Sequence, residues 1–370
     1  MFKRILRILL LLIVVVVLAA VSFVVTLQVT EFNPPAVESL LVSNMPTSNV
    51  DPVELESGVT IKIMTWNLGY ASLSQTEDFV MDGGVKGRMD SRAEVEANID
   101  GIGDTLVDAA ADVYFLQEVD EGSDRSYQTM QYTTYGELLS RPSVYGINYR
   151  CLFVPFPFDL SQMMGKVESG IATFSRFTRL QDAVRIQLPG SFSWPLRLAN
   201  LKRCITVIRT PIEGSDQFLV LINVHLSAYD DGTMRVQEMA ALRQVVSDEY
   251  EAGNYVVVGG DFNQTFPAAV NEVDGETQYL FELRDPSYWE AFAMDGAWFT
   301  ENGWHYGIDL TTPTCRLLNR PLDLEDPANN QYYLIDGFIV SPNVEILSVE
   351  TLDLGFRNSD HNPVVMTFRF

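Results

Sequence analysis

An uncharged run from Ile8 to Leu27, preceded by Lys3, Arg4 and Arg7, restricts this chain more than any other feature. A transmembrane helix needs about 20 apolar residues, and the run is long enough to supply them. Basic residues on its N-terminal side favour an N-terminus in the cytoplasm and a remainder outside it. The sequence therefore predicts a single-pass anchor over residues 1–30, with the rest of the chain on the outer side of the cell membrane.

A cleaved signal peptide is the alternative interpretation, since Ala20-Val21-Ser22 has the small side chains of a cleavage site. The apolar run continues past that site, however, whereas the apolar core of a signal peptide spans only about 7 to 15 residues. We therefore favour an uncleaved anchor over a secreted form. Both outcomes place the remaining residues outside the cytoplasm.

The sequence beyond the anchor divides into two parts. Residues 31–58 contain Asn33-Pro34-Pro35, Met45-Pro46 and Asp51-Pro52, which is typical of an extended stalk. Residues 59–370 carry regular patterns, and the 47% hydrophobic content of the chain is enough for one large core. We predict a single domain over 59–370.

Apolar strand-like segments dominate this domain, with few helical segments between them. Ser91 and Glu94 form a capping box for a helix that runs towards Ala111, and residues 234–250 have helical spacing. The predicted strands are 60–66, 113–117, 170–174, 183–188, 203–209, 218–226, 255–259, 334–340, 346–352 and 364–368. Many strands with few helices predict an α/β fold of two stacked mixed β-sheets flanked by helices, a four-layer α/β sandwich.

The chain is strongly acidic, with 49 acidic and 25 basic residues and a formal net charge of −24. Without Lys3, Arg4 and Arg7 the charge is −27, because no other charged residue precedes Glu31. Such a surface repels polyanions at long range, which argues against a protein that grips nucleic acid through its phosphates. A local basic cleft is still compatible with this average.

Three cysteines, Cys151, Cys204 and Cys315, show no C-x-x-C spacing. Neither a zinc cluster nor a disulfide framework is indicated by this pattern. Whether two of them form a disulfide is left open by the sequence.

Polar side chains recur at the points where predicted strands end. They are Asn67, Glu118, His225, Asp261, Asn263, Asp336, Asp360 and His361. Each signal is weak alone, because a glutamate after a strand is usually solvated and an isolated Asp-x-Asn is usually a turn. Together they indicate a site, since functional residues gather on loops at the edge of a rigid sheet.

Seven short blocks contain all eight of these residues. The blocks are Met64-Thr65-Trp66-Asn67, Leu116-Gln117-Glu118-Val119, Ser169-Gly170-Ile171-Ala172, Asn223-Val224-His225-Leu226, Gly260-Asp261-Phe262-Asn263, Ile335-Asp336 and Ser359-Asp360-His361-Asn362-Pro363. In this order they resemble the endonuclease/exonuclease/phosphatase superfamily, also called the deoxyribonuclease-I-like fold. The resemblance spans residues 59–370 and implies hydrolysis of a phosphate ester.

Metal binding is the first role that these residues suggest. Asn67 and Glu118 offer hard oxygen ligands that suit Mg²⁺ or Mn²⁺, and the resemblance adds Asp360 to the metal side. A metal there would polarise a phosphoryl oxygen and steady the leaving group. Asp261 would position or deprotonate the attacking water, and Asn263 would orient that water or the phosphate.

Two histidines complete the predicted catalytic set. The resemblance places His361 on a phosphate oxygen, with Asp336 fixing its tautomer, and a protonated His361 would stabilise developing charge. The Asn-x-His-Leu block around His225 is more similar to the secreted deoxyribonuclease, sphingomyelinase and lipid-phosphatase branches than to the exonuclease III branch. We expect His225 to make a second phosphate contact or to act as an acid.

Weaker signals lie elsewhere in the chain. Arg125, shortly after Glu118, and Arg203, at the start of a predicted strand, are candidates for contact with the substrate phosphate. We expect residues 81–84 to form an ordinary loop rather than a mobile lid. We expect the aromatic run 153–158 to be buried in the core rather than in contact with lipid or an apolar substrate.

The sequence thus predicts a divalent-metal-dependent phosphoesterase. The anchor, the acidic charge and the His225 block favour lipid-linked or small phosphodiester substrates. A secreted-type nuclease acting on DNA or RNA is the rival, and a non-catalytic binding module is disfavoured because every catalytic block is intact. The sequence leaves open the choice between phosphodiester and phosphomonoester, the native metal and the oligomeric state.

Overall fold

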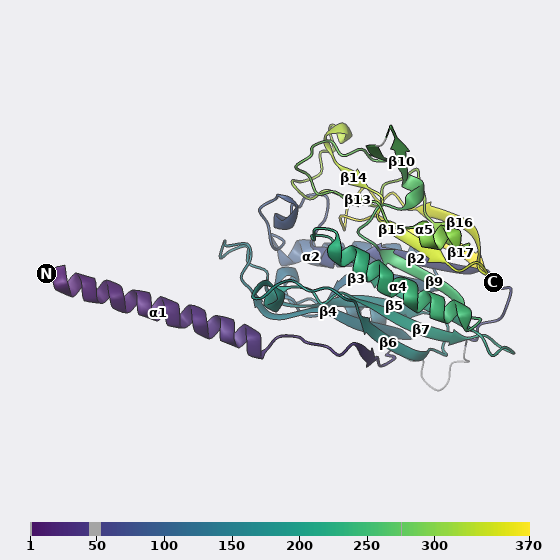
Figure 1. Cartoon of the computed structure of the whole chain (residues 1–370), viewed down its shortest axis with the longest axis horizontal. Helices are drawn as coiled ribbons and strands as arrows, with labels where there is room; N and C mark the ends of the chain where they lie inside the picture. Colours follow the sequence, from purple (N-terminus) through teal and green to yellow (C-terminus); the bar gives the residue numbers. More distant parts are fainter. Residues whose placement is uncertain (1, 44–52, 275) are drawn as a thin grey trace.

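A long helix leads away from a two-sheet domain in the computed structural model, which describes residues 2–43, 53–274 and 276–370 (Figure 1). This helix, α1, covers Phe2–Val29 and is long and apolar enough to cross a membrane. Its most apolar stretch is not buried against the domain, whereas Leu27 near its end is buried. A signal sequence meets the same criteria of length and composition, so α1 is a candidate membrane span.

Two mixed β-sheets form the domain. The first has the strand order β1 (Val37–Ser39), β6 (Gln181–Gln187), β7 (Cys204–Pro211), β8 (Phe218–His225), β9 (Tyr255–Asp261), β15 (Asp336–Val340) and β12 (His305–Gly307). The second has the order β16 (Glu345–Thr351), β17 (Val364–Arg369), β2 (Ile61–Asn67), β3 (Val113–Asp120), β5 (Gly165–Ser175) and β4 (Ser143–Val154). Within both sheets, neighbours are antiparallel except for the pairs β2–β3 and β8–β9.

Smaller elements surround the sheets. Two pairs of antiparallel strands stand outside them, β10 (Val270–Val273) with β11 (Glu276–Tyr279) and β13 (Cys315–Arg316) with β14 (Tyr332–Tyr333). The helices of the domain are α2 (Arg92–Ala109), α3 (Gln131–Leu139), α4 (Thr233–Glu251) and α5 (Ala297–Glu301).

Alternating side chains bury the inner strands on both faces. In β2, Ile63 packs between the two sheets, whereas Met64 packs with the apolar face of α2. In β8, Leu221 packs between the sheets, whereas Ile222 packs with α4. The layers are therefore helix, sheet, sheet and helix, which confirms the predicted four-layer α/β sandwich.

Residues 31–43 and 53–58 belong to the predicted stalk and lie along the domain. Strand β1 pairs with β6 at the edge of the first sheet, and Leu55 is buried and bridges to Ile212. The prolines Pro46 and Pro52 fall outside the described residues. The described parts of this segment are extended, but they are held against the domain.

The three cysteines lie in separate strands, β4, β7 and β13. In the part of the chain that the structure describes, Cys151, Cys204 and Cys315 are all buried and free. The question that the sequence leaves open is thereby answered, because no pair of them forms a disulfide.

Candidate active site

The predicted site residues meet where the inner strands of both sheets end. His225 and Asp261 end the parallel strands β8 and β9 and are paired in register. Asp336 begins β15 and lies opposite Asp261 in the antiparallel pair. From the other sheet, Asn67 ends β2 and Glu118 lies near the end of β3. The stacking of the two sheets thus joins residues that are far apart in sequence.

Asp261 connects the two sheets and is 1% exposed. Asn67 Nδ2 donates to Asp261 Oδ2 at 2.9 Å, and the backbone N–H of Asn263 donates to Asp261 Oδ1 at 2.9 Å. The Nε2 atoms of His225 and His361 lie 3.5 Å and 4.0 Å from Asp261 Oδ2. The two amide donors therefore hold the carboxylate with one oxygen towards both histidines.

His361 forms a buried pair with Asp336, in which His361 Nδ1 and Asp336 Oδ2 are 2.8 Å apart. The other ring nitrogen, Nε2, lies 3.8 Å from Asp360 Oδ2. Burial lowers the pKa of His361, but the negative charge of Asp336, with that of Asp360, raises this pKa well above its ordinary value. His361 is therefore an imidazolium at neutral pH, with Nδ1–H donated to Asp336 and Nε2–H directed into the site.

Two backbone features aim carboxylates at this site. The β3–β5 pairing shifts register between Leu116 and Val119, and Glu118 within that bulge has a φ of 52°. A bulge re-aims a side chain out of the alternating pattern of its strand. At Gly69, with a φ of 50°, a Cβ would lie 2.6 Å from Asp360 Oδ1. Glycine is needed there for the Asp360 carboxylate to occupy its place.

The carboxylates of the site are less acidic than usual. Burial raises the pKa of Asp261 to about 6, and the charge of Asp336 adds to this effect. Burial raises the pKa of Asp360 to about 7, and the charge of Glu118 adds to it. Burial also raises the pKa of Glu118. Desolvation and mutual repulsion thus disfavour the ionised forms, and a bound divalent cation would relieve both.

The donor chemistry fits a hard cation. Ligand atoms lie within 4.8 Å of one another in two clusters, Asp261 with Asp336 and His361, and Cys315 with Asp360 and His361. Burial raises the pKa of Cys315 to about 12, so its thiol is protonated and is a poor ligand. The protonated His361 is likewise no ligand. The remaining donors around the clusters are oxygens, which are the ligands that hard divalent cations prefer.

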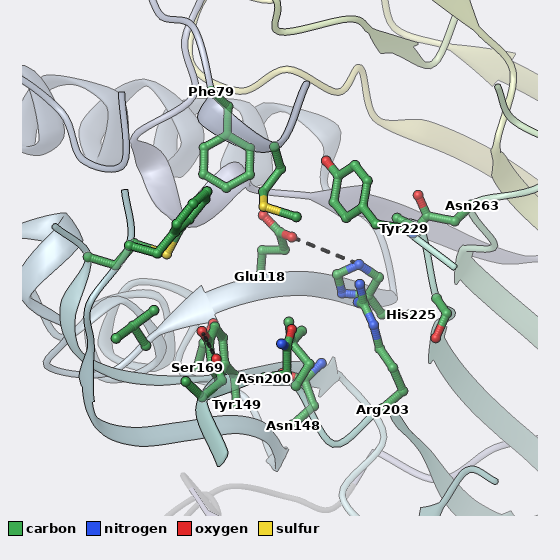
Figure 2. A pocket seen from close by; sticks show the side chains of 18 of the residues that line it. Phe79, Glu118, Asn148, Tyr149, Ser169, Asn200, Arg203, His225, Tyr229 and Asn263 are labelled. Carbon is green, nitrogen blue, oxygen red and sulfur yellow. Dashed lines mark hydrogen bonds and ion pairs between the residues drawn. The ribbon is translucent and has the colours of Figure 1, made fainter. Parts of the chain in front are cut away.

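His225 is a neutral group in this setting. Burial, with the positive charges of Arg203 and His361, lowers the pKa of His225 well below its ordinary value. Its Nε2 lies 3.9 Å from Glu118 Oε1, and Figure 2 shows the two side chains facing each other across the pocket. A neutral imidazole supplies a hydrogen bond rather than a ready proton, which favours the predicted phosphate contact over the predicted acid.

The two arginines predicted for phosphate contact differ in their surroundings. Arg125 Nη2 and Nε pair with both carboxylate oxygens of Asp120 at 2.8 and 3.1 Å, and the guanidinium stacks 3.6 Å above the Tyr70 ring. Arg203 Nη1 has no hydrogen-bond partner among the described residues, and Figure 2 shows its side chain pointing towards His225. Both arginines line the pocket, and the unpartnered Nη1 of Arg203 is a donor left for a ligand.

Asp82 and Tyr229 line the same pocket, although the sequence did not mark them as site residues. Tyr229 Oη donates to Asp82 Oδ1 at 2.7 Å, and the Leu318 backbone N–H donates to Asp82 Oδ2 at 3.1 Å. These bonds hold the short 3₁₀ helix η2 (Val80–Asp82) over the site. The sequence drew attention to the segment 81–84, and two of its residues, Met81 and Asp82, line the pocket.

The pocket is a cavity of about 570 Å³ with a polar and an apolar lining. Its polar lining includes Asn67, Glu118, His225, Asp261, Asn263, Asp360 and His361. Its apolar lining comes largely from one hydrophobic cluster and includes Leu27, Phe79, Tyr149, Val154, Phe156, Met164 and Leu198. Figure 2 shows Phe79, Tyr149 and Glu118 among the side chains that line the pocket, so polar and apolar linings share one space.

The prediction that the aromatic run 153–158 is buried is wrong for two of its residues. Phe158 is 87% exposed and Phe153 is 37% exposed. Two phenylalanines of the run, Phe156 and Phe158, line the cavity. The reason is their place in the fold, since the run closes β4 and enters the β4–β5 connection, beyond the space between the sheets.

Comparison with known proteins gives the family. The endonuclease/exonuclease/phosphatase family matches residues 64–361, which spans all eight site residues. The chain belongs to this family. Members of the family are generally hydrolases of phosphoester bonds and typically depend on a divalent metal. A comparison with curated protein sequences finds no match.

Solved structures with this fold share little sequence with the chain. An endonuclease/exonuclease/phosphatase from Beutenbergia cavernae is 18% identical, with 84% of this chain and 72% of that one covered and a TM-score of 0.52. The human Nocturnin catalytic domain, solved with a bound sulfate anion, is 17% identical, with 86% and 97% covered and a TM-score of 0.50. A functionally unknown protein from Enterococcus faecalis is 15% identical, with 83% and 99% covered and a TM-score of 0.51. At these identities the likeness establishes the fold alone.

Proposed function

We propose that this protein is a divalent-metal-dependent phosphodiesterase that acts on lipid-linked or small phosphoesters outside the cytoplasmic membrane. The observation that carries the proposal is the cavity, in which the carboxylates and histidines share one space with an apolar wall. A phosphoester with an apolar substituent fits both linings at once. A long polyanion would leave the apolar lining without a partner.

Glu118, Asp360 and the side-chain carbonyl of Asn67 would hold the cation. When bound, a divalent cation polarises a non-bridging phosphoryl oxygen and neutralises charge on the leaving oxygen. The pKa values of Asp360 and Glu118, both raised by burial, are the observation that makes these residues a fit for positive charge.

The chain's own groups would carry the proton chemistry. Asp261, with a pKa of about 6, is largely ionised at neutral pH and takes a proton from the water that attacks phosphorus. Asn67 and Asn263 fix the orientation of its carboxylate through their hydrogen bonds. As the water oxygen bonds to phosphorus and the ester P–O bond breaks, Nε2–H of His361 donates to a phosphoryl oxygen and stabilises its charge.

His225 and Arg203 would hold the phosphate from the opposite side. Arg203 provides a guanidinium whose Nη1 lacks a partner within the described residues, and neutral His225 provides a ring N–H. Asp336 keeps His361 charged and oriented through the 2.8 Å contact to Nδ1. These contacts localise one phosphodiester without any extended basic surface.

A substrate panel tests the proposal. Full-length protein in detergent or nanodiscs, with Mg²⁺ or Mn²⁺, is assayed against choline phospholipids, phosphoinositides, a small chromogenic phosphodiester, the matching phosphomonoester, DNA and RNA. We expect hydrolysis of a lipid-linked or small phosphodiester. Rapid cleavage of DNA or RNA alone would contradict the proposal and support a nuclease. No turnover of any substrate in the panel would support a non-catalytic binding module.

Two variants control the panel. Asp261→Asn and His361→Ala should each lower turnover by about 10² to 10⁴-fold, as expected for a positioned acid–base group. Their thermal midpoints should stay near that of the unmodified protein. Near-normal turnover in either variant would show that the residue has been given the wrong role.

The anchor is the second part of the proposal and has its own test. Because α1 is long and apolar enough to cross a bilayer, full-length protein should stay in membranes after high-salt and alkaline washing. Its domain should be open to protease added outside intact cells. Release of a soluble form that starts near Phe23 would establish the cleaved signal peptide instead.

A further inference from the structure

Exposed apolar side chains lie on the segments that contact α1, and on the connection that follows β4. We call them the apolar rim: Phe153, Phe158, Leu160, Trp194 and Leu196, from the end of β4 and the β4–β5 and β6–β7 connections. Their exposed fractions are 37, 87, 90, 60 and 60%. Large apolar side chains this exposed, from two separate connections, mark an interaction surface.

Contacts with α1 fix the rim relative to the helix. The rings of Phe23 and Phe153 lie 6.1 Å apart, edge to face. Trp194 Nε1 donates to Gln28 Oε1 at 3.2 Å, and Lys202 Nζ pairs with Glu31 at 2.9 Å directly after the helix. Figure 1 shows α1 leaving the domain beside the end of β4. The rim is therefore continuous with the candidate membrane span.

The length of α1 gives the depth of the rim. The uncharged run from Ile8 to Leu27 spans the roughly 30 Å hydrocarbon core, which puts Leu27 at its outer boundary. Phe23 lies one turn earlier, about 6 Å inside that boundary. Phe153 shares this depth because it contacts Phe23. Trp194, bonded to Gln28, lies at the interface where tryptophan is enriched in membrane proteins.

We propose that the apolar rim inserts into the adjacent leaflet of a phospholipid bilayer, as a second membrane contact beside α1. Interfacial elements bury their apolar face about 5 to 10 Å deep, and the depth of Phe153 falls in that range. The rim depends on α1 being the anchor of the proposed function, but it requires no particular substrate.

Insertion gives the cavity an entrance from the bilayer. Phe23, Val24 and Leu27 of α1 line the cavity together with Phe158 and Leu196 of the rim. A lipid tail in the leaflet thus meets the apolar lining without passing through water. The anchor helix is then a wall of the binding site as well as a tether.

Apolar burial, rather than charge, drives this contact. The chain without its first basic residues carries −27, which opposes approach to anionic lipid, whereas zwitterionic lipid imposes no such repulsion. The rim should therefore insert into phosphatidylcholine, and its insertion should be insensitive to salt between about 0.05 and 0.5 M.

Depth measurement by spin labelling tests the rim in the full chain. Single cysteines are introduced as Leu160→Cys in the rim, Val15→Cys in the middle of α1 and Val236→Cys, an exposed apolar position on α4, as a matched control. The native cysteines are buried, and the unmodified protein gives the labelling background. Each label is measured in phosphatidylcholine nanodiscs by collision with oxygen and with a water-soluble nickel complex.

We expect the Leu160 label to favour oxygen over nickel at a depth of about 5 to 10 Å, and the Val236 label to favour nickel. A Leu160 label as open to nickel as the Val236 label, with the Val15 label in hydrocarbon, would overturn the rim and leave the anchor. A Val15 label open to nickel would overturn both. Dipolar broadening between Leu160 labels on two copies would show that the rim is a dimer interface, and this result would overturn insertion.

Trp194 gives a second readout without added labels. Brominated phosphatidylcholine quenches tryptophan in the leaflet, so quenching should fall in Trp194→Phe relative to the unmodified protein. The remaining tryptophans, of which Trp66 and Trp304 are buried, set the baseline. Equal quenching in both proteins would also overturn insertion.

Discussion

Asp336 sets the protonation of two other residues at the centre of the site. Its negative charge helps to raise the pKa of His361, the group that must stay protonated. The same charge adds to the burial that raises the pKa of Asp261, the group that must lose its proton. An acid and a base with pKa values on opposite sides of neutrality are thus tuned by one buried carboxylate.

The pH profile of turnover follows from this arrangement. In Asp336→Asn, the loss of negative charge lowers the pKa of His361, so the alkaline limb should move to lower pH. It also lowers the pKa of Asp261, so the acidic limb should move to lower pH as well. Rates measured from about pH 4 to 10 on one substrate check both shifts.

The substitution fits the site, because Oδ1 of Asp336 has no hydrogen-bond partner among the described residues and an amide has the same shape. The exposed carboxylate of Asp353 offers a control, since Asp353→Asn should leave both limbs in place. Movement of the limbs in opposite directions would show that Asp336 does not act on both groups.

Metal dependence is predicted at the same scale. Chelator should abolish hydrolysis, and Mg²⁺ or Mn²⁺ should restore it, because the donors at Asn67, Glu118 and Asp360 are oxygens. Glu118→Gln keeps the side-chain shape but removes the charge, so it should raise the Mg²⁺ concentration for half-maximal rate. Calorimetric Mg²⁺ titration measures the same weakening without turnover.

Glu121 supplies the matched control for this prediction. It lies directly after β3 but accepts hydrogen bonds from Thr133 and the Tyr132 backbone instead of facing the cavity. Glu121→Gln should therefore leave the Mg²⁺ requirement unchanged. Full activity in chelator, or recovery with zinc alone, would contradict the assignment of an oxygen site.

At the scale of elements, the sequence could predict where the buried strands end. A strand buried on both faces is largely apolar, so a polar residue at its end is conspicuous, as at Asn67, which ends β2, and His225, which ends β8. The same pattern, together with the seven family blocks, explains why eight candidate site residues could be named before their contacts were known. Their pairing was not predictable, because Asn67 reaches Asp261 only through the stacking of two sheets.

Irregular elements escaped prediction for physical reasons. Strand β4 is interrupted by Gly146 and Asn148, and its register against β5 shifts twice, so its side chains do not keep a period of two. Phe158 is a large apolar residue of the kind usually found in a core, yet it is exposed in the connection that follows β4. Asp82 enters the pocket through a loop whose course depends on a bond to Tyr229.

Helix α2 carries a prediction about stability alone. Ser91 Oγ accepts from the backbone N–H of Glu94 at 3.3 Å and donates to its carboxylate at 2.7 Å, which forms the predicted cap. Ser91→Ala should lower the free energy of unfolding by about 1 kcal/mol and leave turnover unchanged. Denaturant unfolding of the detergent-solubilised protein measures it, and Ser91→Asp, which keeps an acceptor, should retain most of the stability.

At the scale of the whole molecule, the negative charge and helix α1 both favour membrane-bound substrates over nucleic acid. Residues 31–370 carry a net charge of −27 and repel other polyanions, while α1 and the rim would hold them beside lipid. A tethered site meets membrane-bound substrates at a raised effective concentration. Selection of substrate would then come partly from location and charge, and only partly from contacts inside the cavity.

The sign of the salt effect on DNA cleavage separates the two substrate classes. A protein that binds DNA through many phosphate contacts loses affinity steeply as salt rises. Here the approach of DNA is opposed by net repulsion, which salt screens, so any residual DNA cleavage should be slow at about 50 mM salt and rise towards 200 mM. The rate for a small phosphodiester with one charge should change little. Initial rates at matched Mg²⁺ measure both, and DNA cleavage that is fast at low salt and falls steeply with added salt would establish a local basic groove and promote the nuclease.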